Sequence, residues 1–169
     1  MGVFSLITEK RLFMTIRRAE NRDIPSIGEL LVQVCAVHAQ GRSDLFNMGA
    51  RKYNDKELEE LIADDERPIF VACDEQDSVL GYAFCVFQQS DGKGALTAIK
   101  TLYIDDLCVY ESLRGQHIGS ALYEYVKSFA KEQGCYNVTL NVWACNESAM
   151  KFYEKCGMSV QKIGMETVL

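Results

Sequence analysis

The segment between residues 109 and 120 carries residue types suited to binding a diphosphate. It reads Val109-Tyr-Glu-Ser-Leu-Arg114-Gly115-Gln116-His117-Ile118-Gly119-Ser120. A glycine-containing turn at a helix start directs unpaired backbone N–H groups at one point, and the helix dipole makes the potential there positive. Arg114 adds a charge-assisted contact. The spacing equally fits a strand-to-helix turn in which Gly115 only permits tight geometry, and it matches neither the Walker A pattern nor G-x-G-x-x-G.

Two further pairs of residues carry groups suited to proton transfer or to ligand contact. Asp105 and Asp106 stand at the charged end of the strand before this segment, where a carboxylate can act as a general base. Adjacent residues of a regular strand face opposite sides of a sheet, so we expect only one of them to point into a given site. Asn146 and Tyr153 share one helix face. There the phenol is either a general acid or a core tyrosine, and the amide is a ligand contact, a plain helix cap, or both.

The sequence gives little support to metal, nucleic-acid or membrane binding. Two histidines and seven cysteines occur without C-x-x-C or H-E-x-x-H spacing, so we expect no metal site. The odd cysteine count and the apolar neighbours favour buried free thiols in a reducing compartment. A net charge of −6 without a Lys/Arg cluster argues against a nucleic-acid partner. No apolar run approaches the ~18 residues that a membrane span needs.

Hydrophobic periodicity predicts the elements that position these residues. We expect strands at 15–17, 69–73, 79–87, 98–109, 138–143 and 158–163, and helices at 24–39, 55–64, 118–133 and 146–156. Strands 69–73 and 79–87 should form a hairpin. Strand 98–109 is apolar on both faces, which is typical of a central strand covered on both sides. Because the hairpin interrupts the alternation of strands and helices, we predict an α/β (α+β) fold with a mixed sheet and helices on both faces.

The length and composition fit one domain. A chain of 169 residues with 48% hydrophobic content can bury a substantial core. The regular pattern starts at Met14, so residues 1–13 are predicted to be a leader or a poorly ordered extension.

Two motifs resemble those of the GNAT superfamily of N-acetyltransferases. Residues 114–119 resemble its acyl-CoA loop, Gln/Arg-x-x-Gly-x-Gly/Ala, with His117 where the family usually has glycine. Residues 146–158 resemble its last block, Asn-x-x-Ala-x-x-Phe-Tyr-x-x-x-Gly-Phe. Residues 103–109 resemble the matching strand of spermidine/spermine-type enzymes, and ribosomal-protein-alanine acetyltransferases are further relatives. The resemblance covers 15–163. It implies a single-domain GNAT-like fold over 14–169, with a twisted, mostly antiparallel mixed sheet of about six to seven strands.

The resemblance also implies acetyl-CoA as co-substrate, lying between the ends of strands 98–109 and 138–143. The backbone of Leu107, Cys108 and Val109 would pair with the pantetheine arm, and the Val109 N–H would be the oxyanion donor. Asn146 would bond the pantetheine, and Tyr153 would protonate the departing thiolate. The pyrophosphate would be held by Arg114, Gly115, Gln116, His117, Ile118, Gly119 and Ser120.

His117 departs from the family pattern. Its backbone N–H is retained, but histidine tolerates fewer φ values than glycine, so the loop geometry is in question. Its side chain either meets the pyrophosphate or is exposed.

On the acceptor side, Asp105 matches an acidic residue that acts as the base, often through water, in polyamine-type relatives. Asp106 is the alternative base or a substrate contact. Other relatives carry the base on the next strand, where Asn141 cannot take a proton. The residues predicted to line the acceptor pocket are His38, Asp106, Asn141 and Trp143, although His38 and Trp143 also suit core positions.

The predicted function is direct transfer of an acetyl group from acetyl-CoA to a primary amine of a small molecule or of a protein N-terminus or lysine. The alternative is a non-catalytic acyl-CoA-binding sensor, against which Tyr153 and Asp105 argue. Polyamine-like molecules, amino sugars or antibiotics, and protein amines all remain open as acceptors. We expect a cytoplasmic protein, and a homodimer is an open option because dimers are common among the relatives.

Overall fold

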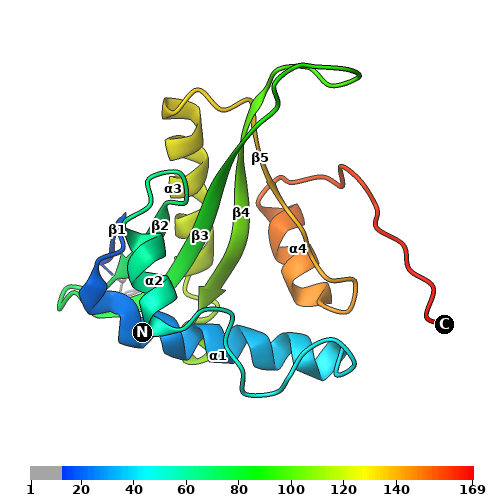
Figure 1. The fold of residues 1–169 in the computed structure, drawn as a ribbon. Helices are drawn as coiled ribbons and strands as arrows, with labels where there is room; N and C mark the ends of the chain where they lie inside the picture. The colour runs from blue at the N-terminus through cyan, green and yellow to red at the C-terminus, as the bar shows by residue number, and fades with distance from the viewer. Residues whose placement is uncertain (1–12) are drawn as a thin grey trace, which may run out of the picture.

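The order of strands in the sheet follows their order in the sequence. The computed structural model describes residues 13–169. The five strands are β1 (Thr15–Arg18), β2 (Ile69–Cys73), β3 (Val79–Gln89), β4 (Lys100–Val109) and β5 (Asn137–Leu140), and they lie side by side in that order (Figure 1). The first three pairings are antiparallel, and β4 pairs with β5 in parallel. The predicted mixed sheet and the predicted hairpin of β2 and β3 are therefore confirmed.

Four α-helices begin and end close to the residues that periodicity indicates. They are α1 (Ile24–Gly41), α2 (Asp55–Ile62), α3 (Ile118–Glu132) and α4 (Glu147–Lys155). Helix α2 has a reciprocal cap, in which the Glu57 N–H donates to Asn54 Oδ1 and the Asn54 N–H donates to Glu57 Oε2.

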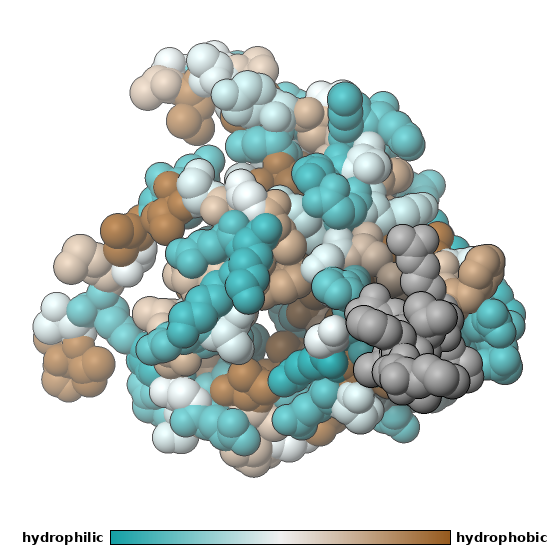
Figure 2. All heavy atoms as spheres, turned by 180° about the vertical axis from the view of Figure 1, so that it is seen from behind, coloured by the Kyte–Doolittle hydropathy of each residue, from teal (hydrophilic) through white to brown (hydrophobic). Residues whose placement is uncertain are grey.

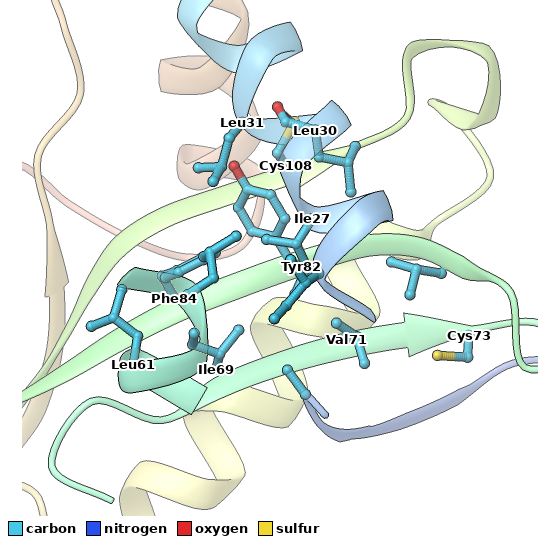
Figure 3. Packing of buried hydrophobic residues seen from close by; sticks show 14 residues of the cluster. Ile27, Leu30, Leu31, Leu61, Ile69, Val71, Cys73, Tyr82, Phe84 and Cys108 are labelled. Atoms are coloured by element: carbon cyan, nitrogen blue, oxygen red, sulfur yellow. Dashed lines mark hydrogen bonds between the residues drawn. The ribbon is translucent and has the colours of Figure 1, made fainter. Parts of the chain in front are cut away.

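The core has one half on each face of the sheet. Along β2, Ile69 and Val71 pack with α1 and α2, whereas Phe70 packs with Leu122 and Val126 of α3. This alternation follows from the two-residue period of a strand. Figure 3 shows the first half, where Leu30 and Leu31 of α1 lie over Tyr82 and Phe84 of β3. Helices therefore cover both faces, as predicted.

The sheet has five strands in the described residues, not six to seven, because the predicted strand at 158–163 does not form. Gly157 adopts φ 87° after α4, and residues 158–169 carry no regular secondary structure. Without a neighbouring strand to pair with, β-forming side chains do not make a strand. Val160, Ile163 and Met165 are 64%, 81% and 95% exposed. Figure 2 shows apolar side chains along this arm, at the left edge of the view.

The predicted leader, 1–13, lies outside the described residues except for Phe13, which has no regular secondary structure.

Candidate functional site

Strands β4 and β5 pair over only part of the length of β4. Residues Thr101–Ile104 pair with Asn137–Leu140, where β5 ends, whereas β4 continues to Val109. The chain after Leu140 runs through a loop into α4. The edge of β4 from Asp105 to Val109 therefore has no neighbouring strand on the β5 side within residues 13–169. The sheet thus opens at the place where the acetyl-CoA site was predicted.

Backbone alternation decides which amides of β4 face this opening. The Tyr110 N–H donates to the Leu80 carbonyl at 3.1 Å, which makes this pair hydrogen-bonded across β3 and β4. By alternation Cys108, opposite Tyr82, also pairs with β3, whereas Leu107 and Val109 point away from it. Of the three predicted backbone contacts, Leu107 and Val109 keep an N–H toward the opening, and the Cys108 backbone is directed to β3.

A side chain of α1 supports the end of β4. Gln33 Nε2 donates to the Val109 carbonyl at 3.0 Å and to Cys108 Sγ at 3.2 Å, and Gln33 Oε1 accepts from the Glu111 N–H at 3.0 Å. Because one amide bonds both sides of Tyr110, it fixes the path of the chain from β4 into the turn before α3.

The N-terminus of α3 presents unpaired amides. The Ala121 N–H makes the first helical hydrogen bond, to the His117 carbonyl, and no side chain caps the helix. The N–H groups of Ile118, Gly119 and Ser120 therefore lack a helical partner, which is the arrangement that binds anions. A Cβ on Gly119 would lie 3.3 Å from Phe152 Cζ, so glycine allows α4 to approach this helix end.

His117 adopts the left-handed conformation. Its φ is 64° and its ψ is 9°, and Gly115 two residues earlier has φ 79°. Glycine takes this conformation without penalty, whereas an L-residue with a Cβ is disfavoured by ~1–2 kcal/mol. The His117 residue is exposed. The departure from the family motif thus keeps the turn at a cost in backbone strain.

A β-bulge corrects the prediction that Asp105 and Asp106 face opposite sides. Phe84 pairs with Asp106 and Cys85 pairs with Ile104, so Asp105 is an extra residue in β4. The side chains of both aspartates consequently point to the α1/α2 face. Asp105 bonds Tyr53, which packs against that half of the core, and Asp106 bonds Tyr82, which belongs to it. The prediction that the two aspartates face opposite sides is wrong because it assumed a strand without a bulge.

The two carboxyls have different partners. Asp106 Oδ2 accepts from the Tyr82 hydroxyl at 2.8 Å. Burial raises the pKa of Asp106 to about 6, against the opposing effects of Tyr82 and Lys52. Asp105 Oδ2 instead accepts from Lys52 Nζ at 2.6 Å and from the Tyr53 hydroxyl at 3.2 Å. At neutral pH Asp105 is the partner of an ammonium ion, and Asp106 is mostly ionised but readily protonated.

Tyr153 lies in α4 between aromatic neighbours. Its ring centroid is 5.0 Å from that of Phe152 and 6.4 Å from that of Tyr123. Burial raises its pKa, and the nearby charge of Asp106 adds to the rise. The phenol is therefore protonated at neutral pH, which is the state that a proton donor needs. Asp106 bonds Tyr82 in the α1/α2 half of the core, whereas Tyr153 packs against the α3 half, so the two groups lie on opposite faces of the sheet.

Asn146 caps α4. Its Oδ1 accepts from the Ala149 N–H at 3.1 Å and from the Ser148 hydroxyl at 3.0 Å. The helix-cap alternative is confirmed, and the amide Nδ2 is the group left for a ligand.

The other residues predicted for the acceptor pocket make contacts between separate elements. The His38 ring lies 5.0 Å from that of Phe46, which lies 5.3 Å edge-on from that of Trp143. Burial and the charge of Lys52 lower the pKa of His38. Trp143 is 42% exposed, which excludes a core role for it. Asn141 Nδ2 donates to the Tyr103 hydroxyl at 3.1 Å. The aromatic contacts join α1, the loop between α1 and α2, and the loop after β5.

Sequence reasoning missed four residues: Gln33, Phe46, Lys52 and Tyr82. Gln33 and Tyr82 could have been found from the sequence. Gln33 is a polar residue among apolar residues of a helix and Tyr82 among those of a strand, and a buried polar group requires a hydrogen-bond partner. Phe46 and Lys52 lie in a loop without periodicity, and only the fold brings them to the site.

Two negative findings apply to residues 13–169. No helix in this range has the length and apolar character required to cross a bilayer. No three His, Cys, Asp or Glu side chains are grouped there as a metal site.

The chain resembles known acetyltransferases over most of its length. The family model described as "Acetyltransferase (GNAT) family" matches residues 27–158. Glucosamine 6-phosphate N-acetyltransferase of Arabidopsis thaliana is 38% identical over 66 residues, which are 39% of this chain and only 42% of that enzyme. Peptidyl-lysine N-acetyltransferase YjaB of Escherichia coli (strain K12) is 29% identical over 151 residues, which are 88% of this chain and 84% of that enzyme.

A solved structure extends this likeness to the fold. A mutant of the BH1408 protein from Bacillus halodurans matches with a TM-score of 0.88 at 30% identity, and the match covers 92% of this chain and 99% of that chain.

The strain at His117 gives a prediction about stability. His117→Gly should raise the free energy of unfolding by about 1 kcal/mol, because glycine adopts positive φ without strain. Gly115→Ala is the matched opposite change and should lower it by about 1 kcal/mol or more. Urea unfolding monitored by circular dichroism measures both. Equal stability of His117→Gly and the parent would show that the strain is absent in solution.

Proposed function

The chain belongs to the acetyltransferase (GNAT) family, and from this premise we propose that it transfers the acetyl group of acetyl-CoA to a primary amine. The observation that carries the proposal is the opening of the sheet beside β4. Unpaired amides of β4 lie along one side of it, and an uncapped helix N-terminus follows in the chain. Asp106 belongs to this stretch of β4, and its charge acts on the Tyr153 phenol. The helix N-terminus can bind a diphosphate and the β4 amides can bind a thioester. The carboxyl can act as a base and the phenol as an acid.

The residues present fit the coenzyme. The N–H groups of Ile118, Gly119 and Ser120 would hold its diphosphate, with Arg114, Gly115, Gln116 and His117 forming the turn around it. The Leu107 and Val109 amides would bond the pantetheine arm, and Asn146 Nδ2 would add a contact from α4. One of the two β4 amides would also bind the negative charge that develops on the thioester oxygen, an interaction worth roughly 2.7–4 kcal/mol.

We assign the base to Asp106 and not to Asp105. Lys52 and Tyr53 already bond Asp105, whereas the one side-chain partner of Asp106 among residues 13–169 is the neutral Tyr82 hydroxyl. A pKa of about 6 also leaves Asp106 able to accept a proton near neutral pH. Asp105 would then bind the cationic acceptor. Tyr153 would give a proton to the CoA sulfur as the C–S bond breaks.

The acceptor is proposed to be a cationic amine. Two carboxylates on one face favour an ammonium ion, and His38, Asn141 and Trp143 would line its approach. Among similar proteins, one is named as an acetyltransferase of glucosamine 6-phosphate and another as an acetyltransferase of peptidyl lysine. A non-catalytic acyl-CoA sensor is the weaker reading, because such a module needs neither a poised carboxyl nor a buried phenol.

A homodimer remains part of the proposal. The arm formed by residues 158–169 is extended, and its side chains Val160, Ile163, Met165 and Val168 are 64%, 81%, 95% and 79% exposed. The outer edge of β5 also has no strand beside it among the described residues. A second copy would supply apolar surface for this arm.

Replacement of Tyr153 tests the enzyme assignment. The parent protein, given acetyl-CoA and a panel of primary amines, should release free thiol. Tyr153→Phe should lower kcat by ~10²–10⁴-fold, because the thiolate leaves without its proton donor, while the affinity for acetyl-CoA in calorimetry stays nearly unchanged. An unaffected rate would remove Tyr153 from this role. Coenzyme binding by the parent without thiol release from any amine would favour the sensor.

Replacement of the aspartates tests which of them is the base. The kcat/KM of the parent should fall below about pH 6, because Asp106 is protonated there and cannot accept a proton. Asp106→Asn should lose this acid limb and at least ~10²-fold in rate. Asp105→Asn is the matched control and should keep the limb with a higher KM. One amine is used throughout, so its own ionisation affects all three profiles alike. The reverse pattern would make Asp105 the base.

Gly119 tests the placement of the diphosphate. Gly119→Glu should abolish acetyl-CoA binding in calorimetry, since it adds a negative charge among the free amides of α3. Gly119→Ala is the control for crowding, because its Cβ already meets Phe152 at 3.3 Å. It should weaken binding much less. If the glutamate variant is folded and still binds as tightly as the alanine variant, the diphosphate lies elsewhere.

A further inference from the structure

Lys52 places a primary amine on the carboxylates of the proposed acceptor site. It lies in the loop between α1 and α2. Its Nζ is 2.6 Å from Asp105 Oδ2 and 5.4 Å from the centroid of the Tyr53 ring. An anion and an aromatic ring are the two partners that bind an alkylammonium ion best. The lysine side chain is 48% exposed, so this contact is made at the rim of the protein and not in its core.

The second carboxyl shares a face with Asp105, and its charge acts on the same amine. The bulge in β4 turns Asp105 and Asp106 to one face. Burial opposes the charge of Lys52, but its hydrogen bond to Asp105 and the further charge of Asp106 raise its pKa above the ordinary value. The proposed base is therefore within electrostatic reach of the Lys52 nitrogen.

Lysines elsewhere in residues 13–169 make different ion pairs. Lys127 pairs with Glu124 and Lys151 with Glu147, each within one helix. Lys93 pairs with Asp91 within one loop. Lys52 is thus the one lysine among the described ion pairs that reaches β4. It bonds Asp105, the carboxylate proposed to bind the acceptor amine.

We propose that Lys52 occupies the acceptor-amine subsite and that its Nζ is acetylated by the same chain when no other acceptor is present. This rests on the proposed function. It narrows the acceptor class to primary alkylammonium ions, of which the lysine side chain is one, and it makes Lys52 a competitor of any added acceptor.

The chemistry is balanced as follows. The Lys52 ammonium loses one proton to Asp106, and its lone pair attacks the thioester carbonyl carbon. The N–C bond forms and the C–S bond breaks, while the sulfur takes a proton from Tyr153. The new amide nitrogen loses its second proton, which restores the tyrosine hydroxyl, and Asp106 releases its own to solvent. The products are Nε-acetyl-Lys52, free CoA thiol and one proton. The ion pair with Asp105 makes the first proton loss unfavourable, so this reaction is slow.

Peptide mapping by mass spectrometry tests the proposal. The purified chain is incubated with acetyl-CoA alone, and acetylation of Lys52 is compared with that of the exposed Lys56, which reports chemical background. Lys52 should be modified on the order of 10-fold faster or more, because its amine is held in place. The rate constant should not depend on protein concentration, and n-butylamine should suppress the modification while being acetylated itself. Tyr153→Phe should reduce Lys52 acetylation to the Lys56 level.

Other outcomes separate this proposal from the proposed function. Acetylation of n-butylamine with Lys52 left at the Lys56 level would overturn the proposal and leave the enzyme assignment in place. A Lys52 rate that grows with protein concentration would overturn transfer within one chain. Coenzyme binding without acetylation of any amine would overturn both. Lys52→Arg keeps the charge and removes the acceptor nitrogen. It should abolish the label on this peptide, which confirms the site of modification.

Discussion

The bulge at Asp105 is the constraint on which the site depends. One extra residue in β4 shifts the alternation of every residue after it. Before the bulge, Leu102 and Ile104 face α3, whereas after it Leu107 and Val109 do. The same shift turns two successive carboxyls to the α1/α2 face. A regular strand would send one of the aspartates into the apolar half of the core under α3, where an unpaired charge is costly.

The pairing of β4 with β5 ends at Ile104, next to the bulge, and α1 supports β4 beyond it. Beyond the bulge, the Leu107 and Val109 amides have no β5 partner, so β4 has a free edge among the described residues. The Gln33 amide takes the Val109 carbonyl and the Glu111 N–H. It thereby satisfies the carbonyl while leaving the N–H groups available. Because the support comes from a helix and not from a strand, the edge is held in place and still open to a ligand.

The sequence predicts the elements well and their irregularities poorly. Periodicity locates all four α-helices and the first five strands, because the spacing of apolar residues within each segment shows which of its side chains are buried. The motif residues Asn146 and Tyr153 lie at the N-cap of α4 and within it, as the predicted helix requires. The bulge, however, depends on the register between β3 and β4, which is set by pairing between distant segments. The loop that carries Phe46 and Lys52 has no period at all. The strand at 158–163 was predicted from its side chains, but a strand also needs a neighbour.

The proton chemistry of the site has a single physical origin. Burial raises the pKa of Asp106 to about 6, and burial likewise raises the pKa of Tyr153. The first effect makes Asp106 a stronger base than an exposed aspartate, and the second leaves the phenol fully protonated over a wider pH range. The charge of Asp106 also raises the pKa of Tyr153, because it makes ionisation of the phenol less favourable. Lys52 holds Asp105 as an ion pair, so the second carboxylate contributes charge without competing for the proton. The packing of β3, β4 and α4 therefore sets the protonation states of the two groups that we propose as base and acid.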